Sequence, residues 1–115
     1  MSKINAITEN WAFTRAYKKG ENLVSPILVT YVVKNNKNNL QVGITTSKKI
    51  GNAVKRARCR RVIRAAFSAI SNDLKSGYDL VFVARTKTSM VKSTEIEKVM
   101  REHLQKAGVL EWKKY

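Results

Sequence analysis

The chain has 115 residues, with 23 Lys and Arg against 8 Asp and Glu, which gives a formal net charge of +15. This length fits one domain, and the hydrophobic fraction of 43% is typical of a folded protein rather than a disordered chain. A charge this large destabilises a fold through self-repulsion, so it favours a polyanionic partner: nucleic acid first, an anionic membrane surface second.

The first predicted element is a short helix over residues 8–19. Thr8 is the expected N-cap residue and Gly20 the expected stop. The apolar positions recur at loosely helical spacing and are Trp11, Phe13, Ala16 and Tyr17. Packing of this stripe against the rest of the domain is its ordinary interpretation.

A β-hairpin is predicted after this helix. Residues 27–33, ILVTYVV, are rich in β-branched side chains and predict a strand, with Pro26 at its entry. The segment KNNKNN is typical of a hairpin turn, because Asn tolerates left-handed backbone conformations. Residues 40–47 alternate apolar and polar side chains and predict the second strand of the hairpin.

The second half of the chain predicts a helix, a strand and a helix. We expect a basic helix over 52–71, a buried strand over 78–85 after Gly77, and a final helix over 93–107 that Gly108 ends. The order α-β-β-α-β-α indicates an α+β fold, with helices packed on a sheet of about four strands.

The basic helix combines an apolar stripe with a dense positive charge. Residues 48–64 hold eight Lys or Arg in seventeen positions and no acid. On a helical wheel the expected core face is Cys59, Val62, Ile63, Ala66, Phe67 and Ile70. The other side carries Arg58, Arg60, Arg61 and Arg64, with Lys55 and Arg56 at its flanks. Cys59 is therefore interpreted as a small buried residue.

The basic arc predicts phosphate binding. A guanidinium group makes two-pronged hydrogen bonds to phosphate and stacks on bases, and no acid at i±4 offsets the repulsion here. Lys48 and Lys49 precede the helix start, where Gly51 permits close backbone approach and free N–H groups favour an anion. A solvated basic face and, at Gly51, an ordinary turn are the alternatives.

The chain offers little material for chemistry of its own. His103 is the only histidine, and we expect it at the surface of the last helix. Cys59 faces inward, and the acidic residues form no D-x-D or E-x-x-H cluster that would hold a metal. We therefore expect a binding protein with no catalytic residue, no organic cofactor and no metal site of its own.

Cysteine content and hydropathy bear on location. One cysteine excludes an intramolecular disulfide and fits a reducing compartment. The first residues carry no apolar core of signal-peptide length, and no apolar run approaches a membrane span. We expect a cytoplasmic protein that forms a single domain over residues 1–115.

Residues 47–61 resemble the signature motif of the protein subunit of bacterial ribonuclease P. The family motif SKK-[IV]-GNAV-x-RNR-x-[KR]-R appears here as SKKIGNAVKRARCRR. The segments AFTRAYKKG, LVTYVV and GYDLVFVAR resemble the family's first helix, first strand and last strand, so the resemblance covers nearly the whole chain. Ala57 stands where the family motif has Asn, so any contact through that amide is absent.

The resemblance implies a protein cofactor of a ribonucleoprotein that removes the 5′ leader from precursor tRNA. Catalysis then resides in the RNA partner, which binds most of the Mg²⁺, and no membrane or obligate protein partner is implied. The residues implied to bind the catalytic RNA are Lys48, Lys49, Asn52, Lys55, Arg56, Arg58, Arg60, Arg61 and Arg64. The residues implied to hold the single-stranded leader are Phe13, Tyr17, Val29, Tyr31, Arg15 and Lys18.

That assignment suits aromatic stacking on unpaired bases beside cations that follow the backbone. The resemblance also implies a left-handed crossover around the basic helix, where the general rule predicts a right-handed one. A generic RNA- or ribosome-binding protein is the second hypothesis, and it would not depend on a tRNA leader. A membrane-surface module is the third, although the core needs the same apolar face. Trp11 is expected to pack, and the tail 111–115 has no assigned role.

Overall fold

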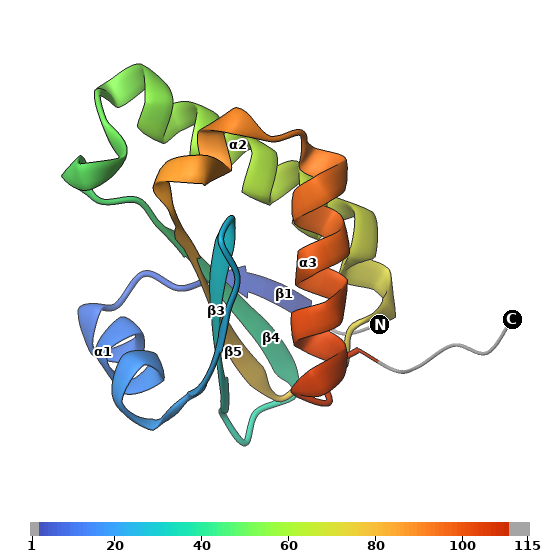
Figure 1. Cartoon of the computed structure of the whole chain (residues 1–115). Helices are drawn as coiled ribbons and strands as arrows, with labels where there is room; N and C mark the ends of the chain where they lie inside the picture. Colours follow the sequence, from blue (N-terminus) through green and yellow to red (C-terminus); the bar gives the residue numbers. More distant parts are fainter. Residues whose placement is uncertain (1–2, 111–115) are drawn as a thin grey trace, which may run out of the picture.

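The computed structural model describes residues 3–110 and shows a five-stranded sheet with helices on both faces (Figure 1). The helices and strands are β1 Lys3–Ala6, α1 Asn10–Lys19, β2 Glu21–Val24, β3 Leu28–Lys34, β4 Asn39–Thr45, α2 Ala53–Ile70, β5 Tyr78–Ala84 and α3 Ser93–Lys106. Three short 3₁₀ helices are η1 Lys48–Ile50, η2 Ser71–Asp73 and η3 Thr86–Met90. The predicted α+β class is confirmed, and β1 and β2 extend the predicted sheet at its two edges.

The two faces of the sheet bury separate hydrophobic clusters, because alternate strand residues point to opposite sides. Leu28 and Phe82 face α2 and α3, where the Phe82 ring packs against Phe67 with centroids 5.9 Å apart. On the opposite face Val81 is buried beneath α1 together with Ala16. α1 therefore stands apart from the other two helices, as Figure 1 shows.

The predicted hairpin between residues 27–33 and 40–47 is wrong. Both strands form, but β5 lies between them, antiparallel to β3 and parallel to β4. The connecting loop crosses the start of β5, where the Asn35 N–H donates to Gly77 O at 3.0 Å and the Gly77 N–H to Asn39 O at 2.8 Å. The buried Asn35 amide also donates to Asp79 Oδ1 at 2.8 Å. The Asn-rich segment therefore connects β3 to β4 across the start of β5, and Asn35 hydrogen-bonds to that strand.

The unit β4–α2–β5 is a parallel crossover, as the resemblance implies. Its left-handed sense stays a prediction. α2 matches the predicted basic helix to within one residue at each end, and Asn52 caps it by accepting a hydrogen bond from the Lys55 N–H at 3.0 Å.

The predicted core face of α2 is confirmed. Its buried members are Cys59, Ile63, Ala66, Phe67 and Ile70, and Val62 packs half-buried beside them. Burial raises the pKa of the Cys59 thiol, while the neighbouring Arg58 and Arg60 act in the opposite direction. Cys59 is accordingly a small core residue.

Two expectations about α1 need correction. The helix begins at Asn10 with Glu9 at the N-cap position, so Thr8 is not the cap, although Gly20 ends the helix as predicted. Trp11 does not pack into the core, because it remains 58% exposed on the outer side of α1. The loose helical spacing of the aromatic residues did not distinguish this outer position from the inner ones.

His103 is buried rather than at the surface. It is 6% exposed between α3 and the sheet, with Nδ1 at 2.8 Å from Thr30 Oγ1. Burial lowers the pKa of His103, and the nearby Lys106 lowers it further, whereas Glu102 opposes this. The hydroxyl partner explains why a polar ring is tolerated there.

The remaining expectations concern the tail and membranes. The tail 111–115 lies outside the described residues. Within residues 3–110, none of the helices combines the length and hydrophobicity that crossing a bilayer requires.

Candidate RNA interface

α1 lies close to the sheet because the residues between them are small. Ala12 and Ala16 are buried against Val81, and the Phe13 ring rests on Gly43 of β4. A Cβ atom at Gly43 would lie 2.5 Å from Phe13 Cε1, so glycine is what lets this ring approach the strand. Phe13 is half-buried, so part of its ring packs against the sheet and the rest is exposed to solvent.

A pair of aromatic rings, one exposed and one half-buried, follows along the same face of the sheet. Tyr17 of α1 meets Tyr31 of β3 edge to face, with ring centroids 5.0 Å apart and planes at 76°. Tyr17 keeps 43% of its surface exposed, and its hydroxyl lies 3.4 Å from Thr45 Oγ1. Val29 is two residues from Tyr31 and therefore shares its face of β3. The structure thus brings together these sequence-predicted leader residues.

Arg15 lies away from this surface. Its Nη2 donates to Lys34 O at 2.7 Å, and its Nη1 lies 4.0 Å from Oδ2 of the buried Asp79. Lys34 is the last residue of β3 and lies three residues beyond Tyr31, about 10 Å at the usual rise per residue. Arg15 therefore lies beside a buried carboxylate near the end of β3, whereas Lys18 is exposed.

The basic motif begins with a constrained turn. Lys48 and Lys49 are exposed on η1, and Gly51 follows with φ +136°. That backbone region is essentially reserved for glycine, so Gly51 is more than an ordinary turn residue. The Asn52 side chain uses its oxygen to cap α2, and its amide nitrogen remains able to donate to a phosphate.

The arginines of α2 divide between two sides of the helix. Arg58 Nε donates to Ser89 O on η3 at 2.7 Å, whereas Arg60 Nη1 donates to Thr46 Oγ1 beyond β4 at 3.0 Å. Lys55, Arg61 and Arg64 are exposed, and Arg56 is half-buried. The ion pairs of Asp79 and Glu97 are with Arg15 of α1 and Arg101 of α3, so neither carboxylate pairs with an arginine of α2.

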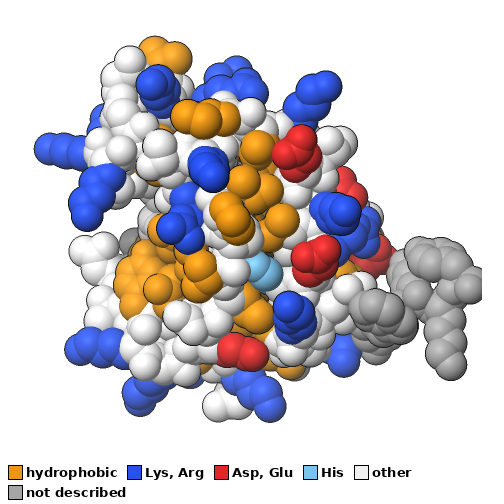
Figure 2. Space-filling model, viewed as in Figure 1, with side chains coloured by type: hydrophobic (Ala, Val, Ile, Leu, Met, Phe, Trp, Pro, Cys, Tyr) orange, Lys and Arg blue, Asp and Glu red, His pale blue; other side chains and the backbone are white. Residues whose placement is uncertain are grey.

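The distribution of charge on the surface agrees with this geometry. Figure 2 shows Lys and Arg side chains over the start of α2, at the upper left, without a visible acid among them. Most acidic side chains on this face lie over α3 instead. A hydrophobic surface lies beside α1, between it and the basic start of α2.

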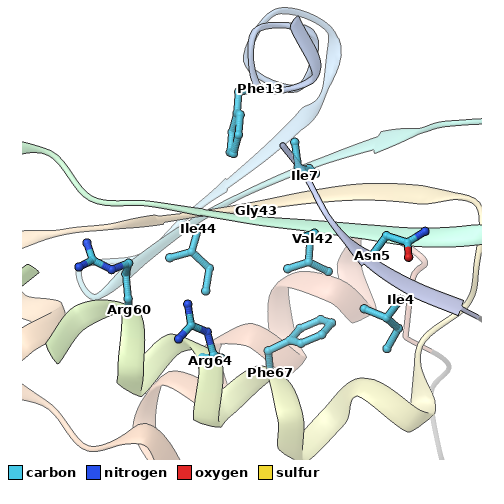
Figure 3. A pocket seen from close by; sticks show the side chains of 11 residues that line it. Ile4, Asn5, Ile7, Phe13, Val42, Gly43, Ile44, Arg60, Arg64 and Phe67 are labelled. Atoms are coloured by element: carbon cyan, nitrogen blue, oxygen red, sulfur yellow. The ribbon is translucent and has the colours of Figure 1, made fainter. Parts of the chain in front are cut away.

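A cavity of about 320 Å³ lies between the aromatic surface and the basic helix (Figure 3). Its walls come from β1, from the edge of β4, from Phe13 of α1 and from the α2 side chains Arg60, Arg64 and Phe67. The sequence analysis did not predict this cavity, because it did not predict β1, whose residues form one wall. A short apolar alternation before the first helix, at Ile4 and Ala6, was the available signal.

The described part of the chain offers no resident metal site. No three His, Cys, Asp or Glu side chains gather among residues 3–110. That the chain has no metal site of its own stays a prediction.

The comparisons with known proteins agree on one family. The family model described as Ribonuclease P matches residues 1–108. The ribonuclease P protein component of Clostridium beijerinckii is 38% identical over 113 residues, covering 92% of this chain and 90% of the relative. That of Clostridium novyi is 40% identical over 111 residues, covering 95% and 98%.

Solved structures show the same similarity in three dimensions. The RNase P protein of Staphylococcus aureus superposes with a TM-score of 0.77 at 31% identity, covering 92% of this chain and 97% of that one. The RNase P protein of Thermotoga maritima gives a TM-score of 0.72 at 24% identity, covering 82% and 89%, and shows the shared fold alone.

Proposed function

The chain belongs to the ribonuclease P protein family, and on this premise we propose how it acts within the tRNA-processing ribonucleoprotein. It binds the catalytic RNA through α2 and the η1 turn, and it holds the single-stranded 5′ leader of precursor tRNA on the aromatic surface beside α1. The proposed setting is the bacterial cytoplasm. The observation that carries the proposal is the contact at 5.0 Å between the exposed Tyr17 and the half-buried Tyr31, on the same molecule as the arginine-rich helix α2.

The aromatic pair supports leader binding through stacking. Every unpaired base has a flat face that an exposed ring can cover, and such a contact contributes about 1–3 kcal/mol whatever the base. Paired bases in the tRNA body have no free face, so this surface discriminates single strands from helices. Tyr31 holds the Tyr17 ring edge-on, which reduces the freedom that Tyr17 would otherwise lose on binding.

The arginine helix supports binding of a structured RNA through phosphate contacts. Each guanidinium forms two parallel hydrogen bonds to a phosphate, and each contact relieves the repulsion that α2 carries alone. Arg58 and Arg60 are already oriented by Ser89 O and Thr46 Oγ1, so little side-chain entropy remains to be lost. These contacts position the RNA without reading its sequence.

We assign phosphodiester hydrolysis to the RNA partner. Mg²⁺ bound by that RNA supplies the activation of water and the stabilisation of charge that the reaction requires. The chain's residues bind and orient the two RNAs and neutralise their phosphates, so that less Mg²⁺ is needed to bring them together.

Binding of precursor and mature tRNA to the reconstituted complex tests the proposal. The protein should tighten binding of precursor tRNA and leave mature tRNA unaffected. Tyr17→Ala should weaken precursor binding about tenfold, because one stacking contact is lost. Trp11→Ala is the matched control, since Trp11 is an exposed aromatic residue on the outer side of the same helix. Equal effects of the protein on precursor and mature tRNA would favour the generic RNA-binding hypothesis.

A further inference from the structure

Asp79 is a carboxylate buried beneath α1. It is 1% exposed, and it lies on the α1 face of β5 with Val81, because strand residues two apart point to the same side. Its Oδ1 accepts a hydrogen bond from the buried Asn35 amide at 2.8 Å. Its Oδ2 lies 4.0 Å from Arg15 Nη1. Burial of a carboxylate is costly unless the group is paired and hydrogen-bonded, so these two partners make the position of Asp79 tolerable.

Arg15 connects α1 to two strands at once. Its Nη2 donates to Lys34 O at the end of β3 at 2.7 Å, and Nη1 of the same planar group faces Asp79 on β5. The Arg15 side chain is 32% exposed and that of Asp79 is 2% exposed, so the arginine is the solvent-facing partner of the pair. A guanidinium is rigid and carries several donors, so it can fix the direction of the helix that bears it.

α1 depends on such contacts because its packing surface is small. The helix has ten residues, and a helix of this length is not stable without tertiary contacts. Its buried residues are two alanines, Ala12 and Ala16, whose small side chains contribute little hydrophobic free energy. The larger side chains at the two flanks of α1 therefore have a large share in fixing its rotation about its own axis.

Arg15 and Tyr17 hold these two flanks. At about 100° per residue they lie about 200° apart around the helix. On one flank Tyr17 contacts the Tyr31 ring and Thr45 Oγ1. On the other flank Arg15 is bound to Lys34 O and faces the buried carboxylate. Loss of the Arg15 contacts leaves α1 held on one flank, and a rotation of the helix then displaces the Tyr17 ring.

We propose that Arg15 and Asp79 are positioning residues, which hold α1 in the rotation that presents Tyr17 to the leader, and that Arg15 is not a ligand of the leader phosphates. This inference rests on the proposed function. The resemblance implies a leader contact for Arg15, but its guanidinium is already engaged on the sheet. A phosphate that took this guanidinium would leave a buried carboxylate without its cation, which is strongly unfavourable.

Variants of each partner separate positioning from phosphate binding. Arg15→Met keeps an unbranched side chain without the charge, and Asp79→Asn keeps an oxygen that can accept the Asn35 hydrogen bond. Arg101→Met and Glu97→Gln are the matched controls, because these two residues form an ion pair within α3. Each variant is assembled with the catalytic RNA, its Tm is measured, and the Kd values for precursor tRNA, mature tRNA and catalytic RNA are compared.

We expect Arg15→Met to weaken precursor binding about fivefold, because a displaced Tyr17 ring keeps only part of its stacking contact. Asp79→Asn should weaken it less, since the hydrogen bond from Arg15 to Lys34 O remains. Binding of mature tRNA and of the catalytic RNA should not change. In a Tyr17→Ala background, Arg15→Met should have little further effect on precursor binding, because both changes act through one ring.

The salt dependence of precursor binding gives an independent measurement. A lost phosphate contact on a single strand reduces the slope of log Kobs against log salt by about 0.7, whereas a lost stacking contact leaves the slope unchanged. We therefore expect Arg15→Met and the wild type to show the same slope, with lower affinity of the variant at every salt concentration.

Arg15→Lys keeps the inference testable if the Arg15→Met chain does not fold. The lysine retains a cation beside Asp79, but a single ammonium group cannot replace a guanidinium that reaches both Lys34 O and the carboxylate. We expect precursor binding weaker than that of the wild type at an unchanged salt slope. A phosphate bound directly at this position would accept lysine as a point charge, and the affinity would be retained.

Three results would overturn the inference. The first is a reduced salt slope in Arg15→Met, or a loss that multiplies with that of Tyr17→Ala, because either would make Arg15 a phosphate ligand. The second is an Asp79→Asn chain that binds precursor tRNA as Glu97→Gln does. The third is an equal loss of affinity for the catalytic RNA, which would indicate a general loss of structure. Failure of the proposed function is distinguishable, because it appears in the wild type alone as equal effects of the protein on precursor and mature tRNA.

Discussion

At the scale of single residues, Tyr17 and Phe82 show how exposure separates two uses of an aromatic ring. Phe82 is fully buried against Phe67, whereas Tyr17 keeps 43% of its surface exposed while it contacts Tyr31. A ring left in water gains its hydrophobic free energy only when a partner covers it. Tyr17 is therefore available for the base stacking that we propose, and Phe82 stabilises the fold.

His103 predicts a pH dependence of stability. Burial holds its pKa below the ordinary value of 6.5, so the unfolded chain binds more protons than the folded one as the pH falls through that region. Stability should be constant near neutral pH and should decrease as the pH falls from about 6.5 toward the lower folded pKa. Urea denaturation at about pH 7.5 and about pH 5.5 measures the change.

His103→Gln is the control for this titration. A glutamine amide can still bond to Thr30 Oγ1 but carries no titratable proton. The variant should therefore lose much less stability than the wild type between the two pH values. An identical loss in both proteins would show that His103 is not the group responsible.

The burial and the partners of single side chains could be predicted from the sequence only in part. The helical period placed Cys59 correctly in the core, because one helix face must pack. The burial of His103 depends on Thr30, which is 73 residues away, and the position of Arg15 depends on Asp79 on another strand. No local pattern encodes such partners, so the sequence analysis expected His103 at the surface and did not anticipate the contact between Arg15 and Asp79.

At the scale of elements, α2 and its preceding turn show where local signals suffice. The helix is long, strongly patterned and capped by Asn52, so its ends were predictable. The strands of the sheet were harder to predict than this helix. β1 and β2 have four residues each, which is too few for a clear alternation of apolar and polar side chains. The Asn-rich loop before β4 has the composition of a hairpin turn, and only the insertion of β5 makes it a crossover.

Gly51 gives a prediction at this scale. Its φ of +136° lies in a region that other residues enter at a cost of about 1–3 kcal/mol, so Gly51→Ala should destabilise the protein by that amount. The midpoint of urea denaturation measures the loss. The new Cβ would also lie 2.9 Å from Lys55 Cδ, at the end of a flexible side chain.

Measuring Gly51→Ala in a Lys55→Ala chain separates backbone strain at position 51 from the contact with the Lys55 side chain. In a Lys55→Ala chain the contact is absent, so a loss of stability that persists there comes from the backbone. We expect it to persist. If Gly51→Ala has no effect in the Lys55→Ala background, the turn is not strained and glycine is there only for space.

At the scale of the whole molecule, the net charge of +15 and the position of α1 together support the proposed function. Phe13, Tyr17 and Tyr31 converge only because α1 packs alone on one face of the sheet. Their spacing along the chain does not predict this, and the family resemblance supplied the expectation. The arginine face, in contrast, followed from helical geometry and charge alone.

The charge predicts a steep dependence of RNA affinity on salt. If the basic motif neutralises about six to eight phosphates, the slope of log Kobs against log salt should lie between roughly −4 and −8. Titrations of the catalytic RNA at several monovalent salt concentrations and constant Mg²⁺ measure this slope. A nearly flat dependence would mean that the arginines of α2 are not the main RNA contacts.

The most direct measurement is cleavage of precursor tRNA at low Mg²⁺ by the protein alone, by a bacterial ribonuclease P RNA alone, and by both together. The account predicts cleavage at the mature 5′ end only in the mixture, because the protein supplies binding and the RNA supplies catalysis. An Ala57→Asn variant, which restores the family residue, runs in parallel to test whether that position limits assembly. Cleavage by the protein alone, or no gain from either protein, would contradict the account.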